Sequence, residues 1–412
     1  MGKPIVSILL MMAAAAPSQA QTAWLTAGND AYQQVRGAIP GLRLLSSRAP
    51  AASLIQAEQL HLLAVPAAQL PRLSRLLHEK RRHCGGFMHH PDQASAQRAL
   101  LAQSAPATSP MSASFPVSLR PSYEIGNQST VTPALAMMRA DAIGDTIARL
   151  SAFPNRLYNS AHGAAASAWL RDHWTALAAP HAGIVVAPYP HAEYGQASVV
   201  ATIAGSDLAS QVVVIGAHLD SISSRSGGSQ AAAPGADDDA SGVAGLTEML
   251  RVAAASAYAP RRTIKLIAYA AEEVGLRGSQ AIARAFKKDA VEVVGVLQLD
   301  MTNYQGSPKD IYLISDYTDA AQNSFLEKLI ASYLPGITIG YDRCGYACSD
   351  HASWQAEGYV TSMPFEAALA QGNPHIHSHR DTYANSGKQA LHALKFTRLG
   401  AAYMMELGAS TP

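Results

Sequence analysis

The hydrophobic positions of this 412-residue chain fall into two patterns that alternate from about residue 116 onward. Short runs that are almost continuously apolar and rich in β-branched residues predict strands buried on both faces. They are residues 211–220 (QVVVIGAHLD), 263–273 (TIKLIAYAAEE) and 291–300 (VEVVGVLQLD). Residues 243–256 place Val243, Leu246 and Leu250 at helical spacing, which predicts an amphipathic helix. The alternation predicts an α/β domain with a largely parallel sheet flanked by helices.

The first 20 residues follow a different pattern. Lys3 precedes the apolar stretch from Ile5 to Ala16, and the small residues Ser18 and Ala20 mark a cleavage position. This pattern is typical of a secretory signal peptide, so we expect export to an oxidising compartment, outside the cell or in a periplasm. A buried N-terminal helix is the alternative.

Residues 21–115 separate the predicted signal peptide from the main domain. Residues 21–92 mix polar and apolar positions without a cluster of catalytic residue types. Residues 92–115 are rich in Ala, Ser, Gln and Pro, a composition typical of a solvated linker. A signal, a small module and a linker suggest a propeptide over 21–115, followed by the main domain over 116–412. A small permanent N-terminal domain is the alternative.

Composition and charge narrow the classes of partner. With 48% hydrophobic residues, the chain can bury a large core. A formal net charge of +1 gives no reason to expect nucleic acid or an anionic membrane as the main partner. After the first 20 residues, no apolar run reaches the roughly 18 residues of a membrane span.

The chain has three cysteines, an odd number for an exported protein. Cys344 and Cys348 enclose a short loop and can form a disulfide if the backbone brings their Cβ atoms together. A zinc-binding pair is the alternative, although no second cysteine pair accompanies it. If the propeptide is removed, Cys84 leaves with it and the mature chain keeps an even pair.

Ionisable residues end each of the three predicted strands. They are His218 with Asp220, Glu272 with Glu273, and Asp300. Because ligands of open α/β sheets bind at the carboxyl ends of the strands, we expect these side chains to converge at one rim. The acidic cluster Asp237–Asp239 lies between the first two strands, and residues 373–382 (NPHIHSHRDT) add three histidines and Asp381.

Carboxylates crowded at one rim would repel one another unless cations lay between them. Histidines among them favour zinc over calcium, which prefers oxygen ligands, and a shared carboxylate would build a two-metal site. Asp220 can accept the other ring N–H of His218 and fix its tautomer as a ligand. Because adjacent side chains point in different directions, one of Glu272 and Glu273 can bind metal while the other acts as general base.

Seven motifs, in this order, resemble the secreted dizinc leucyl aminopeptidases of bacteria, within the zinc exopeptidase superfamily. They are GAHLDS, APGADDDASG, YAAEEVGLRGS, LQLDMTNY, CGYACSDHASW, MPFE and NPHIH. Residues 83–91 (HCGGFMHHP) resemble the propeptide of the same precursors. The resemblance implies a zinc exopeptidase fold with a central mixed sheet and two zinc ions per chain. It also implies a monomer that removes apolar, leucine-type residues from peptides or small proteins with a free N-terminus.

The resemblance also assigns the metal ligands position by position. Asp238, the middle residue of the acidic cluster, would bridge the two zinc ions. His218 and Asp300 would complete one zinc site, and Glu273 and His377 would complete the other.

Further roles follow from the same resemblance. Glu272 occupies the position of the general base, and Tyr346 the position of a residue that hydrogen-bonds the reacting group. His375 and His379 would be neighbours at the surface.

The remaining residues of the acidic loop receive supporting roles. Asp237 and Asp239 are expected to shape the loop or to accept hydrogen bonds behind the ligands. Gly235 and Gly242 would let the backbone bend, and Ser241 would cap the following helix.

Six residues match apolar positions of the substrate pocket in relatives: Met301, Ile314, Tyr346, Met363, Phe365 and Ile376. Two further positions, aromatic in that pocket, are Leu369 and Gly372 here. Losing two rings predicts a wider pocket, in which leucine preference survives weakly and bulkier aromatic residues are accepted better.

Two other classes of protein share this framework. A glutaminyl cyclase resembles it but uses one zinc, and its loop and pocket motifs should differ from CGYAC and MPFE. A non-catalytic relative would have lost metal ligands, whereas here every ligand position and the base position hold a suitable residue type.

Overall fold

The computed structural model describes residues 21–49, 59–81, 85–103, 121–224 and 228–409. The predicted signal peptide, Cys84 and residues 104–115 of the predicted linker lie outside the described residues. No helix in these ranges is both long enough and apolar enough to cross a membrane.

A six-stranded sheet forms the centre of the large domain, in the order β12-β9-β7-β8-β6-β5. Its strands are β5 Ile184–Tyr189, β6 Ser198–Ile203, β7 Leu208–His218, β8 Arg262–Tyr269, β9 Glu292–Gln298 and β12 Thr361–Ser362. The four strands β12, β9, β7 and β8 pair in parallel, whereas β6 and β5 add antiparallel pairs at one edge. The predicted α/β fold with a mixed central sheet is therefore confirmed.

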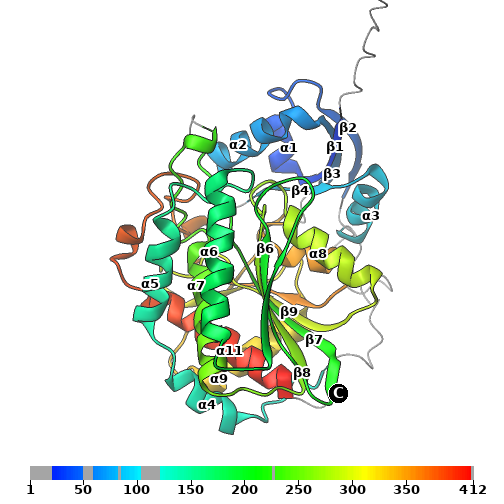
Figure 1. Ribbon diagram of the computed structural model, residues 1–412. Coiled ribbons are helices and arrows are strands. Elements are labelled where there is room, and N and C mark those ends of the chain that lie inside the picture. The colour runs from blue at the N-terminus through cyan, green and yellow to red at the C-terminus, as the bar shows by residue number, and fades with distance from the viewer. Residues whose placement is uncertain (1–20, 50–58, 82–84, 104–120, 225–227, 410–412) are drawn as a thin grey trace, which may run out of the picture.

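Helices cover both faces of this sheet (Figure 1). Successive residues of β7 enter two separate clusters: Val213 and Ile215 pack with α6, α7 and α11, while Val212 and Val214 pack with α8. This two-sided burial explains why the strand has no polar face. The helices of the domain are α4 Gln128–Ala136, α5 Ala140–Ser151, α6 Ala161–Ala178, α7 Ala240–Ala255, α8 Arg277–Lys288, α9 Ala320–Tyr333, α10 His351–Ala356 and α11 Leu391–Ala409. A small sheet, β11-β10-β13, lies beside them, with β10 Ile311–Ile314, β11 Ile339–Asp342 and β13 Pro364–Phe365.

Helix α7 differs from the prediction. Nearly all of its residues are buried, because α5, α6 and α11 pack around it and it also contacts β7. The sequence predicted an amphipathic helix, and helices of that kind usually leave their polar face in solvent. Its alanines and glycines allow neighbouring helices to approach closely. Because these residues are small, they do not stand out as apolar positions in the hydrophobic pattern, and the sequence did not show that they are buried.

The described residues between 21 and 103 form a separate layer, here called the N-terminal module. An antiparallel sheet, β2-β3-β1-β4, is covered by helices and has its own core, which includes Leu25, Leu63 and Leu77. The elements are β1 Thr22–Gly28, α1 Asn29–Val35, β2 Arg43–Arg48, β3 Leu60–Pro66, α2 Leu70–Arg81, β4 Phe87–His90 and α3 Gln93–Gln103. Figure 1 shows the module (blue) seated on one end of the large domain, with β4 next to α8.

Helix α3 corrects part of the predicted linker. Residues 93–103 were expected to be solvated, yet Ala96 and Leu100 pack against Leu60 and Leu62 of β3. Alanine and glutamine are strong helix formers, so the same composition also suits a helix once a sheet covers its apolar side. The solvated-linker prediction is therefore wrong for these residues.

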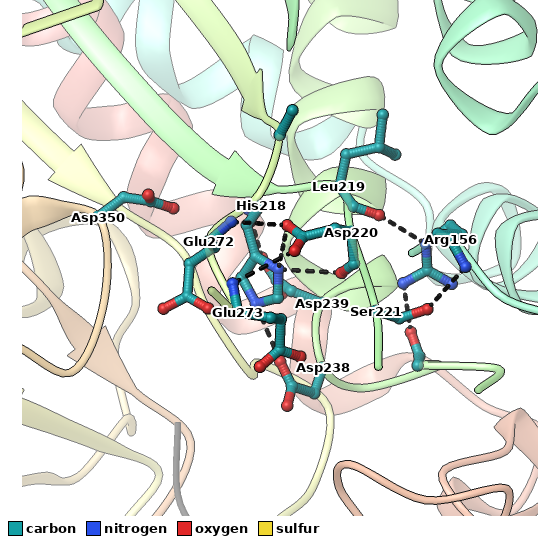
Figure 2. Close-up of polar contacts among 12 residues, drawn as sticks. Arg156, His218, Leu219, Asp220, Ser221, Asp238, Asp239, Glu272, Glu273 and Asp350 are labelled. Carbon is teal, nitrogen blue, oxygen red and sulfur yellow. Dashed lines mark hydrogen bonds and ion pairs between the residues drawn. The ribbon is translucent and has the colours of Figure 1, made fainter. Parts of the chain in front are cut away.

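Arg156 ties together the two loops that follow β7. Its fully buried guanidinium donates from Nε to the carbonyl of Leu219 (2.7 Å) and from Nη2 to the carbonyl of Gly235 (2.8 Å), and Nη1 also donates to Pro234. Its backbone N–H donates to Oγ of Ser221 (3.0 Å). Figure 2 shows Arg156 reaching toward Leu219 and Ser221. A single side chain thus joins the backbone directly after β7 to the backbone that leads into the acidic cluster.

Replacing Arg156 with leucine should strongly destabilise the protein. Several buried carbonyl groups would lose a charged donor, which should lower the free energy of unfolding by at least about 3 kcal/mol. Thermal and chemical denaturation measure the loss. Arg261→Leu is the matched control, since Arg261 pairs with Asp207 at the surface and its loss should leave the melting temperature nearly unchanged. Equal stability of Arg156→Leu and the wild type would contradict this role.

Candidate metal centre

The carboxyl ends of three parallel strands bring the predicted ligands together. Figure 2 shows three of them, His218, Asp238 and Glu273. His218 ends β7, Glu273 follows β8, and Asp300 follows β9. Asp238 comes from the loop before α7, and His377 comes from a loop far along the chain. All five side chains are buried, with at most 4% of any residue exposed. The expected convergence at one rim is therefore present in the structure.

The carboxylate of Asp238 lies between two imidazole rings. Its Oδ1 is 2.9 Å from Nε2 of His218, and its Oδ2 is 2.9 Å from Nε2 of His377. Asp300 Oδ1 joins the first group at 3.5 Å from His218 Nε2, and Glu273 Oε2 joins the second at 3.1 Å from His377 Nε2. One carboxylate thus offers a different oxygen to each of two ligand groups, which is the arrangement that can bridge two cations.

Several of these atoms have no hydrogen-bond partner among the described residues. They are Asp238 Oδ2, Glu273 Oε1 and Oε2, Asp300 Oδ1 and His377 Nε2. Buried polar atoms are nearly always satisfied, so orphaned atoms that face one another call for a bound group. Imidazole nitrogens and carboxylate oxygens are the donor set that zinc takes in catalytic sites. The side chains therefore fit the metal that the sequence predicts.

The electrostatics of the cluster favour protons on the two ligand histidines, and a bound cation would replace these protons. Burial lowers the pKa of His377, but the Glu273 and Asp238 carboxylates outweigh burial and raise that pKa to about 10. Burial likewise opposes a charge on His218, yet Asp300, Asp220 and Asp238 raise its pKa well above the usual value. Without metal, two imidazolium rings therefore offset part of the negative charge of the carboxylates, and metal binding must displace these protons.

Glu272 stands apart from both ligand groups. Its side chain is fully buried, and neither carboxylate oxygen has a hydrogen-bond partner among the described residues. Burial raises the pKa of Glu272 well above its usual value, and the neighbouring Glu273 carboxylate adds to the rise, while His218 opposes it. A buried carboxyl with a raised pKa and free oxygens is suited to proton transfer near neutral pH.

Asp239 organises the backbone around the site. Its Oδ2 accepts from the backbone N–H of His218 (3.0 Å), and its Oδ1 accepts from Gly242 (2.9 Å) and Met301 (3.2 Å). Asp239 lies near His218 and Asp300, but these three donors occupy its oxygens, so we assign it to loop structure. Asp239 also caps α7. The prediction that Ser241 caps this helix is wrong, because its Oγ donates to the carbonyl of Asp237 instead.

Asp237 agrees with its expected supporting role. Its carboxylate accepts from the backbone N–H of Asn303 (2.9 Å) and from the side-chain amide of Asn373 (3.0 Å). Asp381, in turn, accepts from the backbone N–H groups of Asp237 and Asp238. Burial and the nearby Asp237 carboxylate raise the pKa of Asp381 to about 8. These contacts connect the acidic loop to the segment that carries His377.

Asp220 faces His218 through two groups. Nδ1 of His218 lies 3.1 Å from the carbonyl oxygen of Asp220 and 3.6 Å from its carboxylate, so the closer contact is to the main chain. The carboxylate of Asp220 accepts from the backbone N–H groups of Glu272 (2.9 Å) and Glu273 (3.2 Å). Asp220 therefore orients one ligand and also fixes the turn that carries two further functional candidates.

Two features of the site were not predicted from the sequence. Ser349 donates to Oδ2 of Asp300 at 2.5 Å and lies within the CGYACSDHASW motif. Ala271, Met301 and His377 have left-handed backbone conformations, with φ of 58°, 59° and 54°. Such conformations are costly for residues other than glycine and cluster at functional sites.

The predicted pocket residues form one apolar cluster beside the metal centre. Its members are Met301, Ile314, Cys344, Tyr346, Cys348, Met363, Phe365 and Ile376, with Leu369 packed against them. Cys344 and Cys348 form the predicted disulfide. A Cβ at Gly372 would lie 3.5 Å from Phe365 and 3.7 Å from Met301, so position 372 faces this cluster. Of the two other late histidines, His379 is exposed and His375 is half-buried.

Known proteins share both the sequence and the fold. Residues 198–402 match Peptidase family M28. Leucine aminopeptidase 1 of Grosmannia clavigera is 36% identical over 291 residues, which cover 67% of this chain and 70% of that protein. The LapA aminopeptidase of Legionella pneumophila superposes with a TM-score of 0.77 at 28% identity, covering 96% of this chain and all of LapA. LapB from the same organism gives 0.74 at 30% identity, covering 94% of this chain and all of LapB. The chain therefore belongs to peptidase family M28 and is a zinc-dependent aminopeptidase.

Proposed function

We propose that this protein removes apolar residues from the N-terminus of peptides with the help of two zinc ions. His218 and Asp300 would hold one ion, Glu273 and His377 would hold the other, and Asp238 would be shared between them. The observation that carries the proposal is the placement of two imidazoles at opposite oxygens of one buried carboxylate. Relatives named leucine aminopeptidase support an apolar residue at the substrate N-terminus.

Zinc at these positions would polarise the scissile carbonyl, acidify the attacking water and bind the free amine of the substrate. Glu272 takes a proton from the water as its oxygen bonds to the carbonyl carbon. The same carboxyl then delivers the proton to the leaving nitrogen as the C–N bond breaks. The raised pKa of Glu272 favours holding the proton between the two transfers. Tyr346 borders the site and would hydrogen-bond the reacting group.

Glu272→Gln should separate proton transfer from metal binding. The amide keeps the shape of the side chain but cannot accept the proton, so kcat should fall by about 10²–10⁴-fold. Metal analysis should still find two zinc ions per chain. Asp238→Asn is the matched control, since loss of the bridge should lower the metal content as well as activity. Full activity of Glu272→Gln would remove Glu272 from the role of base, and one zinc per wild-type chain would contradict the two-metal assignment.

The apolar cluster that contains Met301 and Phe365 is the proposed specificity pocket. Leu369 and Gly372 leave it wider than two aromatic rings would, so we propose that phenylalanine and methionine are accepted alongside leucine. The support is the position of Gly372, whose Cβ would meet pocket side chains at ordinary contact distances.

Gly372→Phe should narrow this pocket and sharpen selectivity. The added ring fills volume that a bulky substrate side chain would need, so the leucyl-to-phenylalanyl ratio of kcat/KM should rise roughly tenfold. A panel of aminoacyl amides measures the ratio. Gly372→Ala, which adds one methyl group within contact distance, should change it little. A sharp leucine optimum in the wild type would contradict the wide pocket.

We also propose that residues 1–20 direct export and that residues 21–115 are a propeptide, leaving a monomeric enzyme over 116–412. The signal-like composition of the first segment supports export. N-terminal sequencing of the exported protein should give one start after Ala20 for the precursor and a second near residue 116 for the processed form. A single start after Ala20 in fully active material would favour a permanent N-terminal domain.

A further inference from the structure

Helix α2 of the N-terminal module places an unpredicted histidine at the metal centre. Nε2 of His78 lies 3.2 Å from Oε2 of Glu273, and the His78 ring meets the His377 ring edge-on, with 4.3 Å between centroids. The side chain of His78 is completely buried. His78, Glu273 and His377 offer ligand atoms that lie within 4.8 Å of one another. The module therefore contributes a nitrogen to the group of atoms around the second proposed zinc position.

The His78 ring is held in the orientation of a metal ligand. Its Nδ1 lies 2.7 Å from the carbonyl oxygen of Ser74, one helical turn earlier, and can donate its proton there. Nε2 then carries a lone pair directed at the site, and it has no hydrogen-bond partner among the described residues. Metal-binding histidines are fixed in this way, by a hydrogen bond from the other ring nitrogen.

Further contacts fix the module to the same turn of the large domain. Oγ of Ser74 donates to the backbone carbonyl of Glu273 (2.9 Å), and the backbone N–H of His89 donates to Gly275 (3.0 Å). A Cβ at Gly275 would meet Phe87 and His89 at 2.8 Å, so glycine is needed for this approach. The position of His78 is thus set by several contacts around Glu273.

The apolar contacts of the module reach the loop that carries Tyr346. Met88 packs with Leu276, Ala347 and Ala352 in one buried cluster. The module therefore lies against the turn after Glu273 and also against the segment beside the proposed pocket.

We propose that His78 is a ligand of the zinc ion held by Asp238, Glu273 and His377, and that the N-terminal module thereby inhibits the enzyme. This inference rests on the proposed two-zinc function. Structural zinc sites have four protein ligands, whereas catalytic sites keep one position open. His78 would fill the position that the free amine of a peptide substrate needs. The module would thus convert a catalytic site into a closed one, and its removal would reopen it.

The experiment compares the full chain with His78→Ala after zinc loading. X-ray absorption at the zinc edge counts imidazole ligands, and we expect three per two zinc ions in the wild type and two in the variant. Zinc competition with a chelator should show that one of the two ions is held at least tenfold more weakly in His78→Ala than in the wild type. Activity of the uncleaved His78→Ala chain should rise toward that of the processed enzyme. His78→Gln serves as a second variant if the alanine protein does not fold.

His90→Ala is the matched control, because His90 is also buried in the module but contacts Thr26 instead of the metal centre. It should leave the imidazole count and the zinc affinity unchanged. Two imidazoles in the wild type, with equal affinity in His78→Ala, would overturn the proposal and leave His78 as an ion-pair partner of Glu273. Because the imidazole count requires no turnover, a processed enzyme without aminopeptidase activity would contradict the proposed function separately.

Discussion

Mutual repulsion among buried carboxylates is the constraint on which the rest of this structure depends. Asp238, Glu272, Glu273 and Asp300 lie together with almost no exposure to water. Isolated buried charges cost several kcal/mol each, so such a group persists only where positive charge or hydrogen-bond donors compensate it. In the metal-free protein, the protonated rings of His218 and His377 supply part of that charge. Two divalent cations would supply it more completely, and this explains why the ligand atoms lack other partners.

The scaffold around these carboxylates is built almost entirely from backbone donors. Asp220, Asp237 and Asp239 each accept from main-chain N–H groups of other loops, and Arg156 fixes loop carbonyls from the opposite side. Each contact joins segments that are distant in sequence but adjacent at the carboxyl ends of the parallel strands. The acidic side chains behind the ligands hold the loops through hydrogen bonds from main-chain N–H groups. The ligands are therefore held in place before any cation binds. The site is therefore preorganised by the same loops that the sheet brings together.

The sequence predicted the parts of this arrangement that leave a local pattern. Apolar runs buried on both faces marked β7, β8 and β9, and the ionisable residues at their ends marked the rim. Other features depend on contacts between distant segments. Ser241 and Asp239 are both suitable cap residues, but the helix begins at Ala240, so Asp239 accepts from Gly242 at its start and Ser241 lies within its first turn. The composition of helix α3 is typical of a linker, and its burial depends on packing against β3, which is distant in sequence. His78 lies beside the buried Leu77 in an ordinary helix, and its neighbours at the metal centre, Glu273 and His377, are 195 and 299 residues away in the sequence.

The proposed role of His78 is consistent with the charge constraint. A carboxylate from the module would add a further negative charge to a group already crowded with carboxylates, and a lysine would compete with the metal. An imidazole that binds metal does so as a neutral nitrogen donor, and Nδ1 of His78 can donate a hydrogen bond to the Ser74 carbonyl at the same time. In the proposed function, the amine of a peptide substrate would also bind metal as a neutral nitrogen donor. A histidine can thus occupy the substrate position with little change in the net charge of the site, and its departure leaves the ligand set ready for a substrate of the same donor type.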